Sequence, residues 1–205
     1  MELQIQTETT ARIQIKNNKK NKIMDERHRD ENLNTGRKNL FYLDELDDYK
    51  VASEDPDVRG WEVKDANRRT IGRVDNLLVN PNSERVVYLD VEVDNSIIEA
   101  DHDPYQNSAR EGVHEFINSD GENHVIVPVG MARLDRENNC VLTNEITQDT
   151  FAKTNRFRKG EDIDRDYEIY VIDHYRGRDR NATSADRSDD SFYTGNEFDD
   201  RHFKG

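Results

Sequence analysis

The clearest indication of the fold class comes from residues 70–94, whose sequence is TIGRVDNLLVNPNSERVVYLDVEVD. Its second part alternates between apolar and polar positions, which is the period of a β-strand with one buried face. The positions expected to face the core are Val87, Leu89, Val91 and Val93. Those expected on the opposite face are Tyr88, Asp90, Glu92 and Asp94. Residues 85–94 are therefore predicted to form a strand.

The first part of the stretch, Thr70–Asn80, has an apolar spacing that fits a helix as well as a strand. Gly72 favours a bulged or bent strand, because a position without a side chain permits close approach of another backbone. Residues 81–84 have the composition of a tight turn, with Pro81 fixing φ. Residues 70–94 are therefore predicted to form a strand–turn–strand unit.

Further short strands are predicted on both sides of this unit. On the N-terminal side they are Tyr49–Val51 and Trp61–Lys64, the latter followed by a turn over Asp65–Arg68. On the C-terminal side they are His124–Val129, Met131–Asp135, Cys140–Thr143 and Tyr167–Tyr175. Thr147 is placed to cap a short helix from Gln148 to about Asn155, since its hydroxyl accepts a free backbone N–H. Many short strands with one small helix predict a mainly β domain, either a small barrel or a sandwich.

Two polar tails are expected to flank a domain over residues 39–175. Residues 1–38 form a basic arm that is predicted to be disordered. Two further interpretations of the arm are a translation start at Met24 and an electrostatic tether to an acidic partner. Residues 176–205 are also predicted to be disordered, because so few apolar side chains cannot offset the entropy of ordering. Within the domain, residues 95–122 form a long polar excursion of the kind that often carries function.

The acidic residues are concentrated in the predicted domain. Residues 39–175 hold 15 Lys/Arg against 31 Asp/Glu, a net charge of −16, whereas the whole chain has −14. Such a surface repels phosphate backbones and anionic lipids, so the domain is not expected to bind nucleic acid. Cys140 is the only cysteine, which excludes an intrachain disulfide and indicates a small buried residue. No apolar run suits a membrane helix or a signal peptide, so a soluble, cytoplasmic protein is expected.

Several motifs in this order resemble the PRC-barrel family. The matching residues are Gly60, Trp61, Asp65, Ile71, Gly72, Val74, Tyr88, Leu89 and Pro128, spread over roughly residues 40–145. The family includes the cytoplasmic domain of the photosynthetic reaction centre H subunit and the C-terminal domain of a ribosome-maturation factor. The excursion near Glu111–Phe116 and the predicted helix after Thr147 look more like the H subunit. Arg68 stands where the family usually has glycine, and Asn67 is expected to adopt the left-handed conformation instead.

The resemblance implies a small β-barrel with a non-catalytic role as a protein–protein interaction or scaffold module. Its partner is a protein or a second copy of the chain, since an open sheet edge invites strand pairing. A second hypothesis is an H-subunit-like accessory protein that supports electron or proton transfer at a membrane surface, with Glu92, Asp94 and Asp101 as a surface relay. A metal- or small-ligand-binding protein and a ribosome-associated protein are the third and fourth hypotheses. No catalytic residue and no cofactor are expected.

Two clusters have metal-ligating side chains. One consists of Asp101, His102, Asp103 and His114 in the excursion, and imidazole with carboxylate suits zinc or iron. The second consists of Asp162, Asp164 and Asp166, which begins like a calcium loop. An EF-hand requires glycine at its sixth position, where Tyr167 stands, and glutamate at its twelfth, where Asp173 stands. Both clusters match no fixed motif and are predicted to be solvated charge rather than metal sites.

Overall fold

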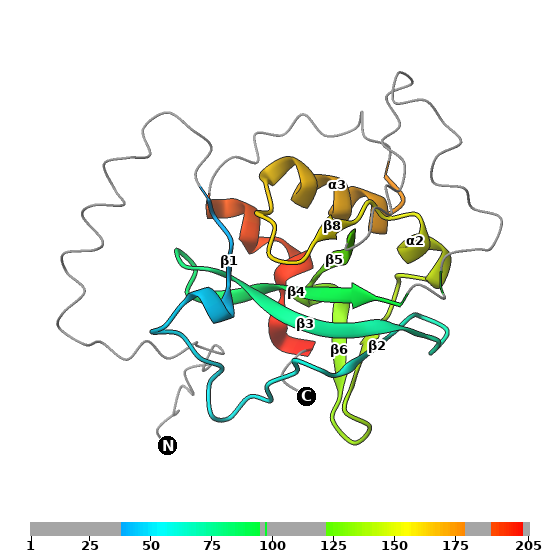
Figure 1. Ribbon diagram of the computed structural model, residues 1–205, viewed down its shortest axis with the longest axis horizontal. Helices are drawn as coiled ribbons and strands as arrows, with labels where there is room; N and C mark the ends of the chain where they lie inside the picture. Colours follow the sequence, from blue (N-terminus) through cyan, green and yellow to red (C-terminus); the bar gives the residue numbers. More distant parts are fainter. Residues whose placement is uncertain (1–37, 95–96, 98–121, 179–189, 203–205) are drawn as a thin grey trace, which may run out of the picture.

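The computed structural model describes residues 38–94, 97, 122–178 and 190–202, and one mixed eight-stranded sheet organises them (Figure 1). The strands are β1 (Phe41–Tyr42), β2 (Glu62–Lys64), β3 (Thr70–Asn80), β4 (Arg85–Val93), β5 (Glu122–Pro128), β6 (Ala132–Asp135), β7 (Cys140–Thr143) and β8 (Phe157–Arg158). Their order is β6-β7-β2-β3-β4-β5-β8, and β1 pairs with β3. The mainly β class is confirmed. In the described part of the chain the sheet is open, with β6 and β8 at its two ends.

The strand–turn–strand unit over residues 70–94 is confirmed as the antiparallel hairpin of β3 and β4. Gly72 serves the close approach predicted for it, because a Cβ there would lie 2.0 Å from the carbonyl oxygen of Glu92. Glu84 closes the turn at a φ of 51°. The hairpin of β6 and β7 is also as predicted. The parallel pairing of β2 with β7 joins the two hairpins into one sheet.

A bulge interrupts the pairing of β3 with β4. Val74 pairs with Val91 and Asn76 pairs with Asp90, so Asp75 is the extra residue on β3. A bulge of this kind bends its strand and changes the direction in which a side chain points.

Both faces of β4 are buried along most of its length, which corrects the prediction of one buried face. Val87, Leu89 and Val91 lie in the core as predicted, but Tyr88 and Asp90 are also fully buried. The second face is covered because α3 (Arg165–Tyr175) and residues 190–202 pack against it. Strand periodicity describes the two faces of a strand but does not tell whether another element covers the polar one.

The segment predicted as the last strand, Tyr167–Tyr175, is part of the helix α3. Asp164 caps this helix by accepting a hydrogen bond from the backbone N–H of Tyr167. The buried positions 168, 171, 172 and 175 follow helical spacing. The alternation of β-branched and aromatic residues was therefore a misleading signal, and the cap together with packing on the sheet decides the conformation.

Three further local predictions need correction. Tyr49–Val51 is not a strand, and the first strand of the described sheet is Phe41–Tyr42 instead. In the turn after β2 it is Arg68 itself, at a φ of 64°, that adopts the left-handed conformation. The helix capped by Thr147 exists as α2 (Gln148–Ala152) and ends about one turn earlier than expected.

The C-terminal tail contributes to the core, contrary to the prediction of disorder over residues 176–205. Residues 190–202 of this tail form the three short 3-10 turns η5 (Asp190–Thr194), η6 (Asn196–Phe198) and η7 (Asp200–His202). Tyr193 is 2% exposed and Phe198 is 1% exposed. The basic arm lies almost entirely outside the described residues, as do most of residues 95–122. None of the helices in the described ranges combines the length and apolar character that a membrane span requires.

Candidate functional site

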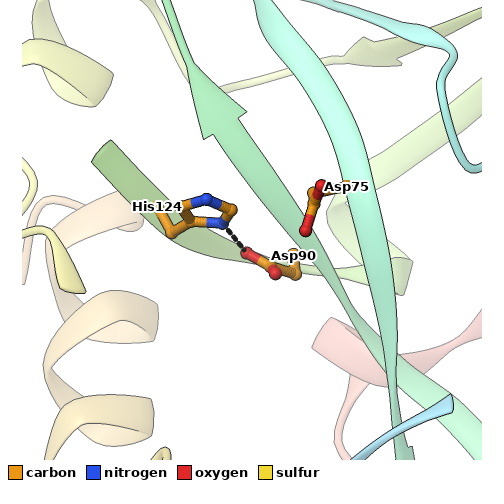
Figure 2. A group of neighbouring side chains, drawn as sticks. All are labelled: Asp75, Asp90 and His124. Carbon is orange, nitrogen blue, oxygen red and sulfur yellow. Dashed lines mark hydrogen bonds and ion pairs between the residues drawn. The ribbon is translucent and has the colours of Figure 1, made fainter. Parts of the chain in front are cut away.

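Three side chains from neighbouring strands meet on the covered face of the sheet (Figure 2). They are Asp75 from the bulge in β3, Asp90 from β4 and His124 from β5, and their potential ligand atoms all lie within 4.8 Å of one another. His124 and Asp90 are diagonal neighbours, because Asp90 pairs with Ile126 and His124 pairs with Glu92. Among the described residues this is the group whose donors suit a metal ion.

Burial makes this cluster electrostatically unusual. Asp90 is 0% exposed and His124 is 2% exposed. The Nδ1 atom of His124 lies 2.8 Å from Oδ1 of Asp90, whereas Oδ2 of Asp90 is buried without a hydrogen-bond partner. Burial raises the pKa of Asp90, the hydrogen bond with His124 opposes this rise, and the charge of Asp75 adds to it. An uncompensated carboxylate oxygen in the interior is costly, so this oxygen requires a proton or a cation nearby.

Asp75 connects the buried pair to the surface. Its side chain keeps 18% of its exposure and accepts a hydrogen bond of 2.6 Å from the ammonium of Lys159, which is itself 66% exposed. The cluster therefore combines two carboxylates and one imidazole, with a removable positive charge at its outer rim. Such a group can bind a cation or exchange a proton with solvent.

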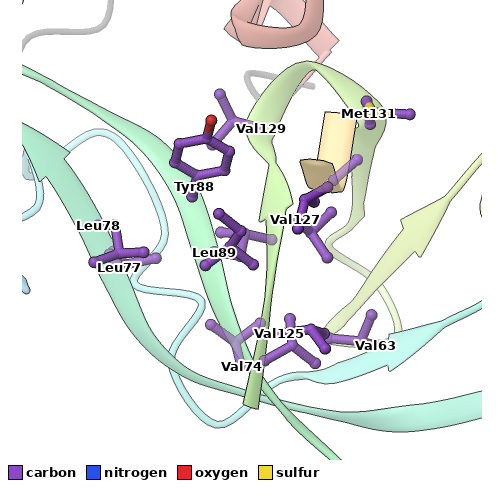
Figure 3. Close-up of a cluster of buried hydrophobic side chains, with 14 of the residues drawn as sticks. Val63, Val74, Leu77, Leu78, Tyr88, Leu89, Val125, Val127, Val129 and Met131 are labelled. Atoms are coloured by element: carbon purple, nitrogen blue, oxygen red, sulfur yellow. The ribbon is translucent and has the colours of Figure 1, made fainter. Parts of the chain in front are cut away.

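A second site is the part of the covered face of β4 against which residues 190–202 dock. The ring of Phe198 packs edge-on against Tyr88 at a centroid distance of 5.3 Å and against Tyr193 at 5.2 Å. Figure 3 shows Tyr88 at the end of the core beside Val129. The guanidinium of Arg165 lies 3.9 Å from the ring centre of Phe192 and 4.8 Å from that of Tyr193. Aromatic anchors in a desolvated pocket are the contacts that usually dominate binding energy.

Backbone contacts orient the docked segment. The Nη2 atom of Arg85 donates to the carbonyl oxygens of Tyr193 and Phe198 at 2.7 and 2.9 Å. Gly130 in η4 (Val129–Met131) lies against the segment so closely that a Cβ would stand 2.4 Å from the carbonyl oxygen of Asn196. Arg176 also pairs with Glu197 at 3.0 Å. The segment is thus held by both its side chains and its main chain.

Between α3 and this segment lies a buried carboxyl group. Glu168 is 1% exposed, and the hydroxyls of Tyr88 and Tyr193 face it. Its Oε1 atom pairs with Nε of Arg165 at 3.4 Å, and its Oε2 atom is buried as well. Burial raises the pKa of Glu168 from 4.5 to about 7, and the nearby Arg165 opposes the rise.

The raised pKa of Glu168 predicts a stability that falls with rising pH. Between about pH 4.5 and pH 7 the folded state holds a proton that the unfolded state has lost, so stability decreases through this window. The shift corresponds to a loss on the order of 3 kcal/mol. The variant Glu168→Gln cannot ionise, so it should be more stable than the wild type at pH 8 and close to it at pH 5. Urea unfolding of both proteins across this range measures the difference, and equal pH slopes would contradict the prediction.

The metal candidates named from the sequence are not assembled in the described structure. Asp101, His102, Asp103 and His114 lie outside the described residues. Asp162, Asp164 and Asp166 are exposed and do not form a group of potential ligands. Asp164 caps α3, and Asp162 pairs with Lys38 at 2.6 Å, so two of the three have structural roles.

The residues on which the family resemblance depends occupy positions in the structure that explain why each position has its particular amino acid. Asp65 is 1% exposed, and its carboxylate accepts hydrogen bonds from the backbone N–H groups of Asn67, Arg69 and Gln148. Gly60 has a φ of 83°, which favours glycine. The core contains Ile71, Val74, Tyr88 and Leu89, while Trp61 packs at its edge. Pro128 ends β5 opposite Tyr88.

Asp90, His124 and Glu168 are buried polar groups that the sequence pattern did not predict. The available signal was their position among apolar neighbours: Asp90 interrupts an apolar run in β4, and His124 directly precedes another in β5. A scan against protein-family models found no match to the chain, and a search of curated proteins found none either. The PRC-barrel resemblance therefore depends on the motif residues named above.

Proposed function

We propose that the protein is a non-catalytic interaction module of the PRC-barrel type that binds a short aromatic peptide segment against the covered face of its sheet. The observation that carries this proposal is the docking of residues 190–202, whose Tyr193 and Phe198 are as buried as the core. Eleven positions, 179–189, separate this segment from the end of the preceding described range. In its contacts the segment resembles a bound peptide more than a further element of the sheet.

The contacts have the character of peptide recognition. Arg85 reads the backbone through two carbonyl oxygens, so this contact does not depend on the side chains of the segment. Specificity comes from the aromatic pocket beside Tyr88 and from Arg165, which stacks on two rings. Backbone hydrogen bonds with a few aromatic anchors are a recurring way of binding peptides.

The partner we infer is a second copy of this chain that exchanges its C-terminal segment. The segment from either copy offers identical contacts, and exchange of an identical element is a low-cost route to a dimer. This proposal agrees with the homodimer expected from the sequence. The H-subunit-like role and the ribosome-associated role stay predictions, because no described contact bears on them.

A peptide added in trans tests the proposed function. The full chain carrying Tyr193→Ala and Phe198→Ala has a weakened segment of its own, so its pocket is available. A peptide of residues 188–205 should bind this variant and raise its thermal unfolding midpoint in proportion to occupancy. Differential scanning fluorimetry and fluorescence anisotropy of the labelled peptide measure the two effects.

The matched control adds Gly130→Ala to the same variant, because a Cβ at this position blocks the backbone of the segment. Peptide binding should then be lost although far-UV circular dichroism shows the same sheet content. Equal binding by both variants, or no binding to the first although it is folded, would contradict the proposal. Mixing two differently tagged full-length proteins then tests exchange, and failure to recover mixed dimers would exclude the second copy as partner.

A further inference from the structure

The Asp75–Asp90–His124 cluster is separate from the peptide surface and has a donor set of its own. Two carboxylates and one imidazole converge from three different strands, with their potential ligand atoms within 4.8 Å of one another (Figure 2). Donor atoms around a tetrahedral zinc ion stand about 3.3 Å apart when each bond is about 2.0–2.1 Å long. Small side-chain rotations therefore bring all three donors into bonding distance of one ion.

The carboxylate of Asp90 is only partly compensated by its neighbours. Oδ1 of Asp90 is engaged by His124, but Oδ2 is buried and has no hydrogen-bond partner. Natural structures rarely leave a buried carboxylate oxygen without a partner, and such exceptions call for an ion, a water molecule or a functional role. This second observation distinguishes the cluster from a surface group of acidic residues.

The backbone of β3 brings Asp75 into the cluster and leaves this residue partly accessible to solvent. Asp75 is the extra residue of the bulge in β3, and the bulge places its carboxylate beside Asp90 instead of in the regular strand pattern. Asp75 remains partly exposed, and its partner Lys159 is largely exposed. A cation that enters from solvent has to displace only the flexible ammonium group of Lys159.

We propose that Asp75, Asp90 and His124 bind one divalent first-row transition-metal ion. Carboxylates alone suit Mg²⁺ and Ca²⁺, whereas imidazole shifts the preference towards Zn²⁺ and its neighbours in the series. Three protein ligands leave further coordination positions of the ion for water. The ion neutralises the charge of the two carboxylates and ties β3, β4 and β5 together. Its ligands differ from the residues that hold the peptide segment. The metal site can therefore be tested independently of the proposed function.

Titration of the chelator-treated full-length protein with Zn²⁺, in an isothermal calorimeter, tests the site. Mg²⁺ serves as the hard-cation comparison. The wild type should bind one Zn²⁺ more tightly than Mg²⁺. The variant Asp75→Asn should bind Zn²⁺ at least about tenfold more weakly, since even the loss of an outer partner of a ligand costs that much. His124→Gln should have the same effect.

Asp149→Asn is the matched control, because Asp149 is an exposed aspartate that pairs with Lys153 at 2.8 Å much as Asp75 pairs with Lys159. This control should bind Zn²⁺ like the wild type. If His124→Gln fails to fold, Asp75→Asn still decides, since its side chain lies near the surface. Wild-type affinity in Asp75→Asn, or the absence of Zn²⁺ binding by the wild type, would overturn the proposal. Loss of binding in His114→Gln but not in Asp75→Asn would also overturn it.

Discussion

Replacing Phe198 with alanine is expected to lower the free energy of unfolding by about 3–5 kcal/mol. Phe198 is 1% exposed, and its ring contacts Tyr88, Phe192 and Tyr193. Its removal leaves a cavity between the sheet and the C-terminal segment. Tyr193 is then the one fully buried aromatic side chain that the described part of the segment retains. Equilibrium unfolding in urea, followed by circular dichroism, measures the loss.

A suitable control for this prediction is Phe192→Ala. Phe192 belongs to the same aromatic group but is only partly buried, so its removal should cost less than half as much. If both variants were as stable as the wild type, the segment would not be docked in solution. The proposal that this surface binds peptides would then lose its main support.

Replacing Asp65 with alanine is expected to destabilise the protein by a similar amount, about 3–5 kcal/mol. Its carboxylate accepts hydrogen bonds from three backbone N–H groups, including that of Gln148 at the start of α2. Arg69 adds a pairing at 2.9 and 2.7 Å through Nε and Nη2. Alanine leaves these donors without an acceptor and detaches α2 from the turn after β2.

The dependence of protein stability on pH in acid solution provides an independent test of the contribution of Asp65. Burial alone would raise the pKa of Asp65, but hydrogen bonds from the backbone and side chain of Arg69 outweigh it and hold the pKa below its usual value. The stabilisation is therefore complete above the unfolded pKa of about 3.9 and is lost as pH falls through the lower folded pKa. The difference between Asp65→Ala and the wild type should shrink in acid.

Asp135→Ala is the matched control for Asp65. Asp135 also accepts a hydrogen bond from a turn backbone, that of Asn138, but the turn is exposed to solvent. Water replaces the lost contact there, so the cost should stay below about 1 kcal/mol. Similar losses in the two variants would mean that burial of Asp65 does not produce its effect.

The two proposed sites share one structural cause. The face of β4 that alternation assigns to solvent is covered, and each polar residue on it needs a partner. Tyr88 meets the C-terminal segment, and Asp90 meets His124. Further along the chain, Glu92 near the end of β4 and Asp94 just after it are exposed, as the sequence predicted. The elements that cover this face of β4 therefore create the two proposed sites, and they do so only at Tyr88 and Asp90.

Single residues in the sequence correctly predicted those local features that depend only on residues close to them in the chain. Gly72 indicated the close approach of β4, and Thr147 indicated the start of α2. In both cases the physical cause lies within the residue itself, either the absence of a Cβ or a hydroxyl placed to cap a helix. α3 was missed because β-branched and aromatic residues alternate in it, although Asp164 offered a cap signal as clear as that of Thr147.

The order of the amino acids was sufficient to predict the mainly β class, the central hairpin, the hairpin of β6 and β7, and the burial of Cys140. These features follow from contacts between residues close in the chain or from the alternation along one strand. The burial of Phe198 in the core and the meeting of Asp75, Asp90 and His124 became visible only in the folded protein. Such contacts depend on strand order, on a bulge and on which element covers a face, and all three are set by packing between distant segments rather than by local preference.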